Sequence, residues 1–115
     1  MKKLTVLAAV AALATATPAM GAELSDSEAK VCALTGISAK AIMAGRQAGI
    51  SPSKVYETLE PMMKEKLPAM LDLVIIMIRE AYARPSFFGT REQAKAISDY
   101  QVEKELSCFK HFTSN

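Results

Sequence analysis

Apolar and polar positions recur with helical spacing between Pro68 and Pro85, in the segment "PAMLDLVIIMIREAYARP". At about 100° per residue, apolar side chains cover most of the circumference, and Asp72 and Arg79 mark one narrow polar edge. A helix that is apolar on most sides belongs in the middle of a bundle. The pattern therefore predicts a central helix that ends at Arg84, before Pro85. Its apolar face is centred on Met70, Val74, Met77 and Ala81.

A first helix is predicted from about Ser25 to the glycine at position 49. Ser25 and Glu28 have the spacing of a capping box, in which each side chain accepts from the other residue's backbone N–H. Gly49 suits the left-handed conformation that often follows a helix C-terminus. The apolar face of this helix contains Val31, Leu34, Ala39 and Ile42.

The second helix begins directly afterwards. Ser51 is a favoured N-cap residue, and Pro52 suits the first helical position. Pro61 is expected to break or kink this helix, because proline lacks a backbone donor and clashes with the preceding turn. Residues 62–67 are then either a continuation of the helix or an irregular link.

The last helix is predicted from about Arg91 to Lys110, after the loop "PSFFGT". Thr90 and Gln93 form a second capping-box pattern at its start, and residues 111–115 are expected to be a frayed tail. No credible strand pair is present. The sequence thus predicts an all-α domain of four helices, arranged around the apolar third helix.

The first 22 residues have the pattern of a secretory signal peptide. Two lysines at positions 2–3 precede an apolar, alanine-rich run over residues 4–16, and small residues follow. Cleavage after Ala22, or alternatively after Gly21, leaves a single helical domain over residues 23–115. An uncleaved N-terminal anchor is the alternative. Export would place the protein in the periplasm or outside the cell.

Removal of the signal changes the charge balance. The whole chain has 14 basic and 12 acidic residues, and Lys2 and Lys3 lie within the signal. Residues 23–115 therefore carry 12 of each sign, without a basic patch, which argues against a nucleic-acid partner. The later apolar run over residues 73–78 is far shorter than the roughly 20 residues of a membrane-spanning helix.

Two cysteines, Cys32 and Cys108, lie near the two ends of the predicted domain. In an exported protein an even number of cysteines favours a disulfide, and two free thiols are the alternative. No CxxC motif supports a redox activity. The cysteines and the single histidine, His111, do not make an ordinary zinc site. We expect one disulfide and no cofactor.

Two other patterns have a chemical interpretation. Methionines 63, 70 and 77 recur every seven residues, which fits a hydrophobic core, a flexible binding groove or a copper(I) site. The core is the preferred interpretation, because these residues fall on apolar faces. Carboxylates in apolar surroundings could support glycoside cleavage, although helix pairing is preferred; they are Glu57, Glu60, Asp72 and Glu80.

Two short groups are candidate partner-binding residues. The loop group combines two phenylalanines with flanking arginines, the residue types enriched at interface hot spots. The helix-end group closes the first helix and could bind an anion or a partner's backbone. The alternative for the loop group is that one or both rings fold over the core. The alternative for the helix-end group is a helix-terminal cation beside a solvated amide. The candidates are Phe87, Phe88, Arg84 and Arg91 in the loop group, and Arg46 and Gln47 in the helix-end group.

The segments "RQAG" (46–49) and "AYARP" (81–85), together with the placement of the two cysteines, resemble the layout of a set of small, uncharacterised exported proteins of proteobacteria and their phages. The resemblance implies a periplasmic, disulfide-bonded helical domain and assigns no functional residues. The favoured function is non-enzymatic binding of an envelope or periplasmic protein. A holdase-type chaperone is the first alternative, and a small cell-wall hydrolase is the second.

Overall fold

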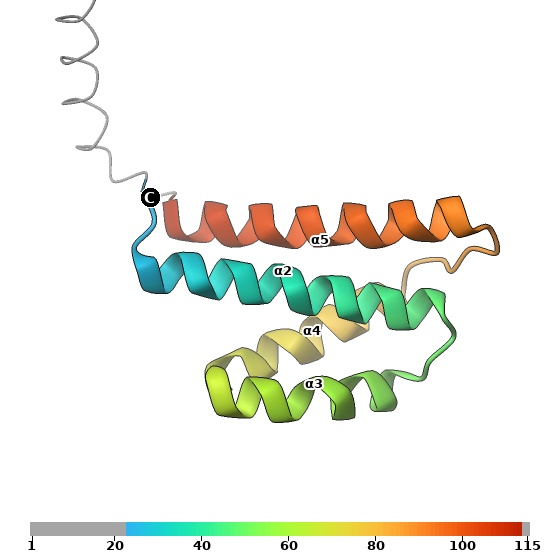
Figure 1. Cartoon of the computed structure of the whole chain (residues 1–115), viewed down its shortest axis with the longest axis horizontal. Coiled ribbons are helices and arrows are strands. Elements are labelled where there is room, and N and C mark those ends of the chain that lie inside the picture. Colours follow the sequence, from blue (N-terminus) through green and yellow to red (C-terminus); the bar gives the residue numbers. More distant parts are fainter. Residues whose placement is uncertain (1–22, 114–115) are drawn as a thin grey trace, which may run out of the picture.

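The computed structural model describes residues 23–113 and contains no strand among them. The predicted all-α fold with four main helices and one disulfide is confirmed. The predicted signal peptide, residues 1–22, lies outside the described residues. In chain order the helices are α2 (Asp26–Gln47), α3 (Pro52–Lys66), the short 3₁₀ helix η2 (Pro68–Met70), α4 (Leu71–Tyr82) and α5 (Thr90–Thr113) (Figure 1).

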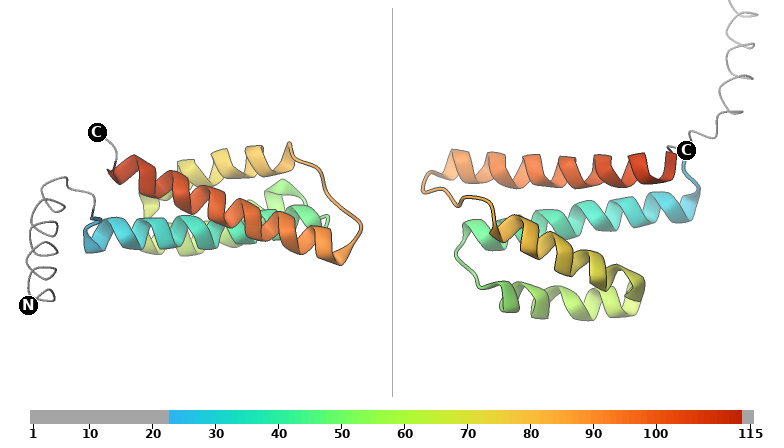
Figure 2. Two further views of the ribbon diagram at one scale, coloured as in Figure 1. Left: turned by 90° about the horizontal axis from the view of Figure 1, so that it is seen from above. Right: turned by 180° about the vertical axis from the view of Figure 1, so that it is seen from behind.

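The helices form two hairpin-like pairs. The long helices α2 and α5 run side by side, and α3 and α4 pack together against α2 (Figures 1 and 2). The central helix is α2, which lies against all three other main helices. The predicted central position of the third helix is therefore wrong. The reason is that α4 is only 12 residues long, and its Ile75 and Ile76 remain 43% and 52% exposed.

The core nevertheless contains the apolar face predicted for the third helix. Met70, Val74, Met77 and Ala81 are all buried, and Ile42 of α2 is completely buried beside them in the same cluster. In α5, Tyr100 alone belongs to this core, so most of that helix covers α2 with partly exposed side chains. The remaining members of the core are Ala39, Met43, Val55, Leu59, Met63 and Ile78.

The helix ends of the first half follow the sequence signals. The backbone N–H of Glu28 donates to Ser25 Oγ (3.1 Å), and that of Ser25 donates to Glu28 Oε1 (2.9 Å), which completes the predicted capping box. Gly49 adopts φ 78°, and the N–H groups of Gly49 and Ile50 close a Schellman motif on the last turn of α2. Ser51 then caps α3 through the N–H of Lys54.

Pro61 does not break the second helix, and of the two alternatives for residues 62–67 the structure has the continuing helix. α3 continues through it to Lys66, and the chain turns at Leu67 instead. Pro61 is itself exposed, whereas Leu59 and Met63 on either side of it are buried in the core. Their packing holds the segment helical and offsets the hydrogen bond that proline cannot make.

Two details of the last helix also differ from the prediction. Thr90 is already helical, and the N–H of Gln93 bonds to the carbonyl of Gly89, so α5 begins one residue early. The Gln93 side chain bonds elsewhere, as described below. At the other end, α5 continues through residues 111–113, which were expected to be frayed. The disulfide at Cys108 and the partial burial of Phe112 hold this last turn in place.

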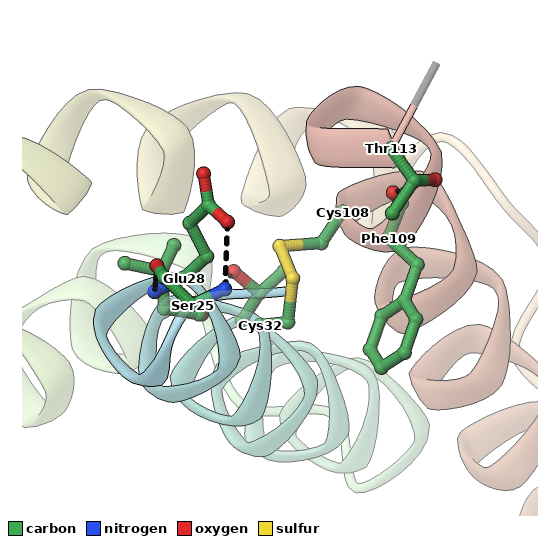
Figure 3. Close-up of a disulfide and its surroundings, with 8 residues drawn as sticks. Ser25, Glu28, Cys32, Cys108, Phe109 and Thr113 are labelled. Carbon is green, nitrogen blue, oxygen red and sulfur yellow. Dashed lines mark hydrogen bonds between the residues drawn. A yellow bond between two sulfur atoms is a disulfide. The ribbon is translucent and has the colours of Figure 1, made fainter. Parts of the chain in front are cut away.

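The predicted disulfide is present. Cys32 of α2 and Cys108 of α5 are joined with an S–S distance of 2.06 Å and a Cα–Cα distance of 5.4 Å (Figure 3). Cys32 is almost fully buried, so the bond lies inside the α2–α5 contact. It closes a loop with a sequence separation of 76 residues, which includes nearly all of the folded domain.

We expect the loss of this disulfide to cost much of the domain's stability. The chain-entropy model assigns about 4–5 kcal/mol to a loop of this length, and small domains are stable by only about 5–15 kcal/mol. Urea unfolding of the oxidised protein, the reduced protein and the double variant Cys32→Ala/Cys108→Ala measures the difference. The reduced protein and the double variant should share a lowered midpoint, and an unchanged midpoint in both would contradict this.

Candidate functional site

The loop between α4 and α5 is fixed to the C-terminal end of α2. Arg46 Nε and Nη2 both donate to the backbone carbonyl of Arg84, at 3.0 and 2.9 Å. The Arg46 guanidinium also lies over the ring of Tyr82, 5.5 Å from its centroid. Arg46 therefore makes its contacts within the molecule and holds the start of the loop.

Gln47 makes the most complete contact with this loop. Its Nε2 donates to the carbonyl of Pro85 (3.0 Å) and contacts Met43 Sδ (3.4 Å), while its Oε1 accepts from the backbone N–H of Phe87 (2.8 Å). Gln47 is only 7% exposed. A buried amide must have its donors and acceptor paired, and here the loop backbone supplies the partners. We call Arg46 and Gln47 the loop clamp.

Two further side chains complete the attachment. The Tyr82 hydroxyl donates to the carbonyl of Ile50, which joins the end of α4 to the turn after α2. Burial raises the pKa of Tyr82, so this donor stays protonated in neutral solution. Gln93 Nε2 donates to the carbonyl of Phe87 at 2.6 Å. The backbone N–H and C=O of Phe87 are thus both bonded by glutamine side chains, one from α2 and one from α5.

The two segments that carried the family resemblance therefore meet in space. Arg46 and Gln47 come from "RQAG", and Tyr82, Arg84 and Pro85 come from "AYARP". Gly45, just before the first segment, leaves room mainly for Val55 of α3. A Cβ at that position would lie 2.6 Å from the Val55 side chain and 3.4 Å from the Tyr82 hydroxyl.

The loop clamp positions two phenylalanines on the surface. The Phe88 side chain is fully exposed, and Phe87 is 39% exposed. Arg91, at the start of α5, is also exposed. Neither ring is folded into the core, so the structure favours the exposed arrangement of the loop group over the alternative. Their role in partner binding stays a prediction.

Arg84 differs from the rest of the loop group, because its side chain is bound within the molecule. Nη1 and Nη2 pair with both carboxylate oxygens of Glu103, at 2.9 and 2.8 Å, and the guanidinium lies 4.8 Å from the centroid of the Tyr100 ring. The hydrogen bond from Arg84 lowers the pKa of Glu103. Arg84 thus joins the loop to the middle of α5, whereas the loop clamp joins the loop to α2.

A second pair continues this polar network between α4 and α5. Lys104 Nζ donates to Glu80 Oε1 at 2.7 Å, and the buried Tyr100 hydroxyl lies 3.0 Å from the same oxygen and 2.9 Å from the carbonyl of Met77. Burial raises the pKa of Tyr100. Burial also opposes ionisation of Glu80, but the hydrogen bonds from Lys104 and Tyr100 outweigh it and lower the pKa of Glu80.

The other chemical candidates do not converge on a site. Methionines 63, 70 and 77 are buried within the hydrophobic core, which fits the core interpretation. Within residues 23–113, no cluster of three or more histidine, cysteine and acidic side chains is placed to hold a metal ion. Glu80 is bound in an ion pair, Glu57 contacts Lys54 on the surface, and Asp72 is exposed. His111 is exposed in the last turn of α5, where its ring contacts Phe112.

Comparisons with protein-family models, with curated proteins and with solved structures found no match for this chain. The resemblance to small exported proteins therefore stays a prediction. None of the helices in residues 23–113 is long and apolar enough to cross a membrane.

The loop clamp is tested by Gln47→Leu. This change keeps an apolar side chain of similar size but leaves the Phe87 N–H and the Pro85 carbonyl without their partner. We expect a loss of about 1–3 kcal/mol in unfolding free energy and faster amide hydrogen exchange at Phe87. The control is Gln101→Leu, a half-exposed glutamine in the middle of α5. Equal exchange at Phe87 in the two variants would contradict the clamp.

The ion pairs predict a dependence of stability on pH. Glu80 and Glu103 have a lower pKa in the folded state, so the stability they contribute is present above the unfolded pKa of about 4.3. It is lost as the pH falls through the folded pKa. We expect the urea midpoint to fall below about pH 5, with a smaller fall in Glu80→Gln/Glu103→Gln than in the exposed control Glu65→Gln. An equal fall of the urea midpoint in the double variant and in Glu65→Gln would argue against a role for these ion pairs in stability.

Proposed function

We propose that this protein acts after export as a binding protein, with the exposed part of the loop group (Phe87, Phe88 and Arg91) as its contact surface. The observation that carries the proposal is the fully exposed ring of Phe88 on a loop whose backbone is bonded from both sides. Burying a phenylalanine side chain is worth about 1.5–3 kcal/mol. That free energy is not gained on folding here, so it is available to a partner.

The fixed backbone strengthens this argument. A flexible loop loses conformational entropy when it binds, whereas a loop already held in place avoids much of that cost. The loop clamp and Gln93 fix Phe87 through its N–H and its carbonyl, directly beside Phe88. The exposure of Phe88 is therefore a property of an ordered segment. An aromatic ring with a neighbouring arginine is the composition typical of interface hot spots.

The proposed partner is an envelope or periplasmic protein. A structural disulfide is typical of oxidising compartments, which supports action outside the cytoplasm. A stable protein–protein interface buries about 800 Å² on each side, more than one loop supplies. The contact would therefore extend over the exposed first turns of α5.

A holdase-type chaperone is the second candidate, because α5 has an exposed apolar stripe. Val102, Leu106 and Phe109 recur at helical spacing and are 50%, 56% and 47% exposed. A holdase would suppress aggregation of unfolded proteins through such a stripe and would not require Phe88. Substitutions therefore distinguish the two functions: binding through the loop requires Phe88, whereas a holdase requires the stripe on α5.

Phe88→Ala tests the proposed surface. The ring has lost no exposure on folding, so we expect unfolding free energy within about 0.5 kcal/mol of the unsubstituted protein. A photo-crosslinking phenylalanine analogue at position 88 should give one discrete adduct in the periplasm of producing cells. The matched control is the same analogue at Ile76, an exposed apolar position on α4.

Two results would contradict the proposal. The first is an early-melting Phe88→Ala variant, because the ring would then belong to the core. The second is an equal pattern of adducts at positions 88 and 76. Suppression of client aggregation that persists in Phe88→Ala but fails in Leu106→Ala would favour the holdase instead.

A further inference from the structure

A crevice opens at the end of the molecule that lies away from the proposed contact loop. The helices α2 and α5 have 22 and 24 residues, whereas α3 has 15 and α4 has 12. The α2–α5 pair consequently extends beyond the α3–α4 pair at the end where the disulfide lies (Figure 1). The start of α2, the last turns of α5 and the η2 turn enclose a crevice of about 620 Å³.

The walls of the crevice are mainly apolar. The volume falls within the range of about 300–1,000 Å³ that is typical of small-molecule sites. The half-buried Leu73 and Phe112 face it from α4 and α5, and Cys108 contributes part of the disulfide. The other apolar lining residues are Val31, Leu67, Ala69 and Met70.

The polar groups of the crevice lie mainly along one helix. Lys104, Ser107 and His111 line it from successive turns of α5, and each has a hydrogen-bond donor. Thr35 from α2 also lines it, but its hydroxyl donates to the Val31 carbonyl within its own helix. None of the described lining residues is acidic. The polar edge therefore matches a ligand that presents oxygen acceptors.

Lys104 retains capacity for such a ligand. Its ammonium group has three donors; Glu80 Oε1 lies 2.7 Å from Nζ, and Glu103 Oε2 lies 3.6 Å away. Only the contact with Glu80 is a hydrogen bond, so the ammonium group can also donate to an acceptor in the crevice. Both carboxylates also attract any cation near this edge, but neither lines the crevice itself.

We propose that the crevice binds one single-chain amphiphile with a carboxylate headgroup, a free fatty acid. The alkyl chain would lie against the apolar walls, and the carboxylate would accept hydrogen bonds from the α5 edge. Charge-assisted hydrogen bonds of this kind are about twice as strong as neutral ones. A volume of about 620 Å³ fits one alkyl chain better than the two chains of a phospholipid.

The test compares dodecanoate with dodecylamine, both below their micelle-forming concentrations, by calorimetric titration of the purified protein with its disulfide intact. Residues 23–115 carry 12 charges of each sign, so overall charge favours neither ligand. We expect saturable binding of one dodecanoate per chain, about tenfold tighter than dodecylamine. Ser107→Trp, which fills the crevice from an exposed position, should abolish binding, while Ser98→Trp on the same helix should not.

Four outcomes would overturn the proposal. Equal or tighter binding of dodecylamine would show that the polar edge does not select an anion. Binding that survives Ser107→Trp and Ala69→Trp, both with unchanged melting temperatures, would place the alkyl chain elsewhere. Uptake onto phospholipid vesicles without binding of free dodecanoate would identify a membrane surface as the ligand. Absence of saturable binding to the wild-type protein would exclude the site directly.

Discussion

The pairing of α2 with α5 is the constraint on which the rest of the molecule depends, and it is fixed at both ends. At one end the Cys32–Cys108 disulfide joins the two helices covalently. At the other end Gln47 holds the loop that leads into α5. Between them, α5 buries only Tyr100 in the core. A helix with so little apolar burial gains modest stability from packing alone, so its position relies on these two attachments and on the ion pairs with α4.

The same arrangement explains how an exposed aromatic ring is held in an ordered position. Hydrogen bonds from side chains on α2 and α5 satisfy the backbone of the loop around Phe87, although the loop itself buries little surface. The backbone of this segment is therefore held in place by hydrogen bonds, without burial of its side chains. In the core, by contrast, order follows from close packing of Ile42, Met77 and their neighbours. This difference allows a contact surface to be apolar without becoming part of the core.

The features that the sequence predicts well are those that depend on neighbouring residues. The Ser25 cap, the Gly49 turn and the start of α3 at Pro52 all follow local rules, and all are present. The uninterrupted passage of α3 through Pro61 depends on tertiary packing, which overrides the local preference.

The loop clamp could not be inferred from spacing, because its partners are 38 and 40 positions away along the chain. An arginine and a glutamine at a helix end are ordinary surface residues in sequence. Only the path of the loop makes them internal hydrogen-bonding groups. The central position of α2 has the same origin. The buried face of α4 follows its apolar pattern, but the lengths of the neighbouring helices decide which helix is enclosed.

The two sides of the loop also respond differently to acid. On the α5 side, Arg84 is bound to Glu103, a carboxylate that loses its charge when the pH falls through its lowered pKa. On the α2 side, the backbone of Pro85 and Phe87 is bonded by the Gln47 amide, which does not ionise. Acid therefore weakens the attachment of α4 to α5 before it affects the attachment of the loop to α2. The position of Phe88 is set mainly by the groups that do not titrate, so its presentation is less sensitive to pH than the stability of the bundle.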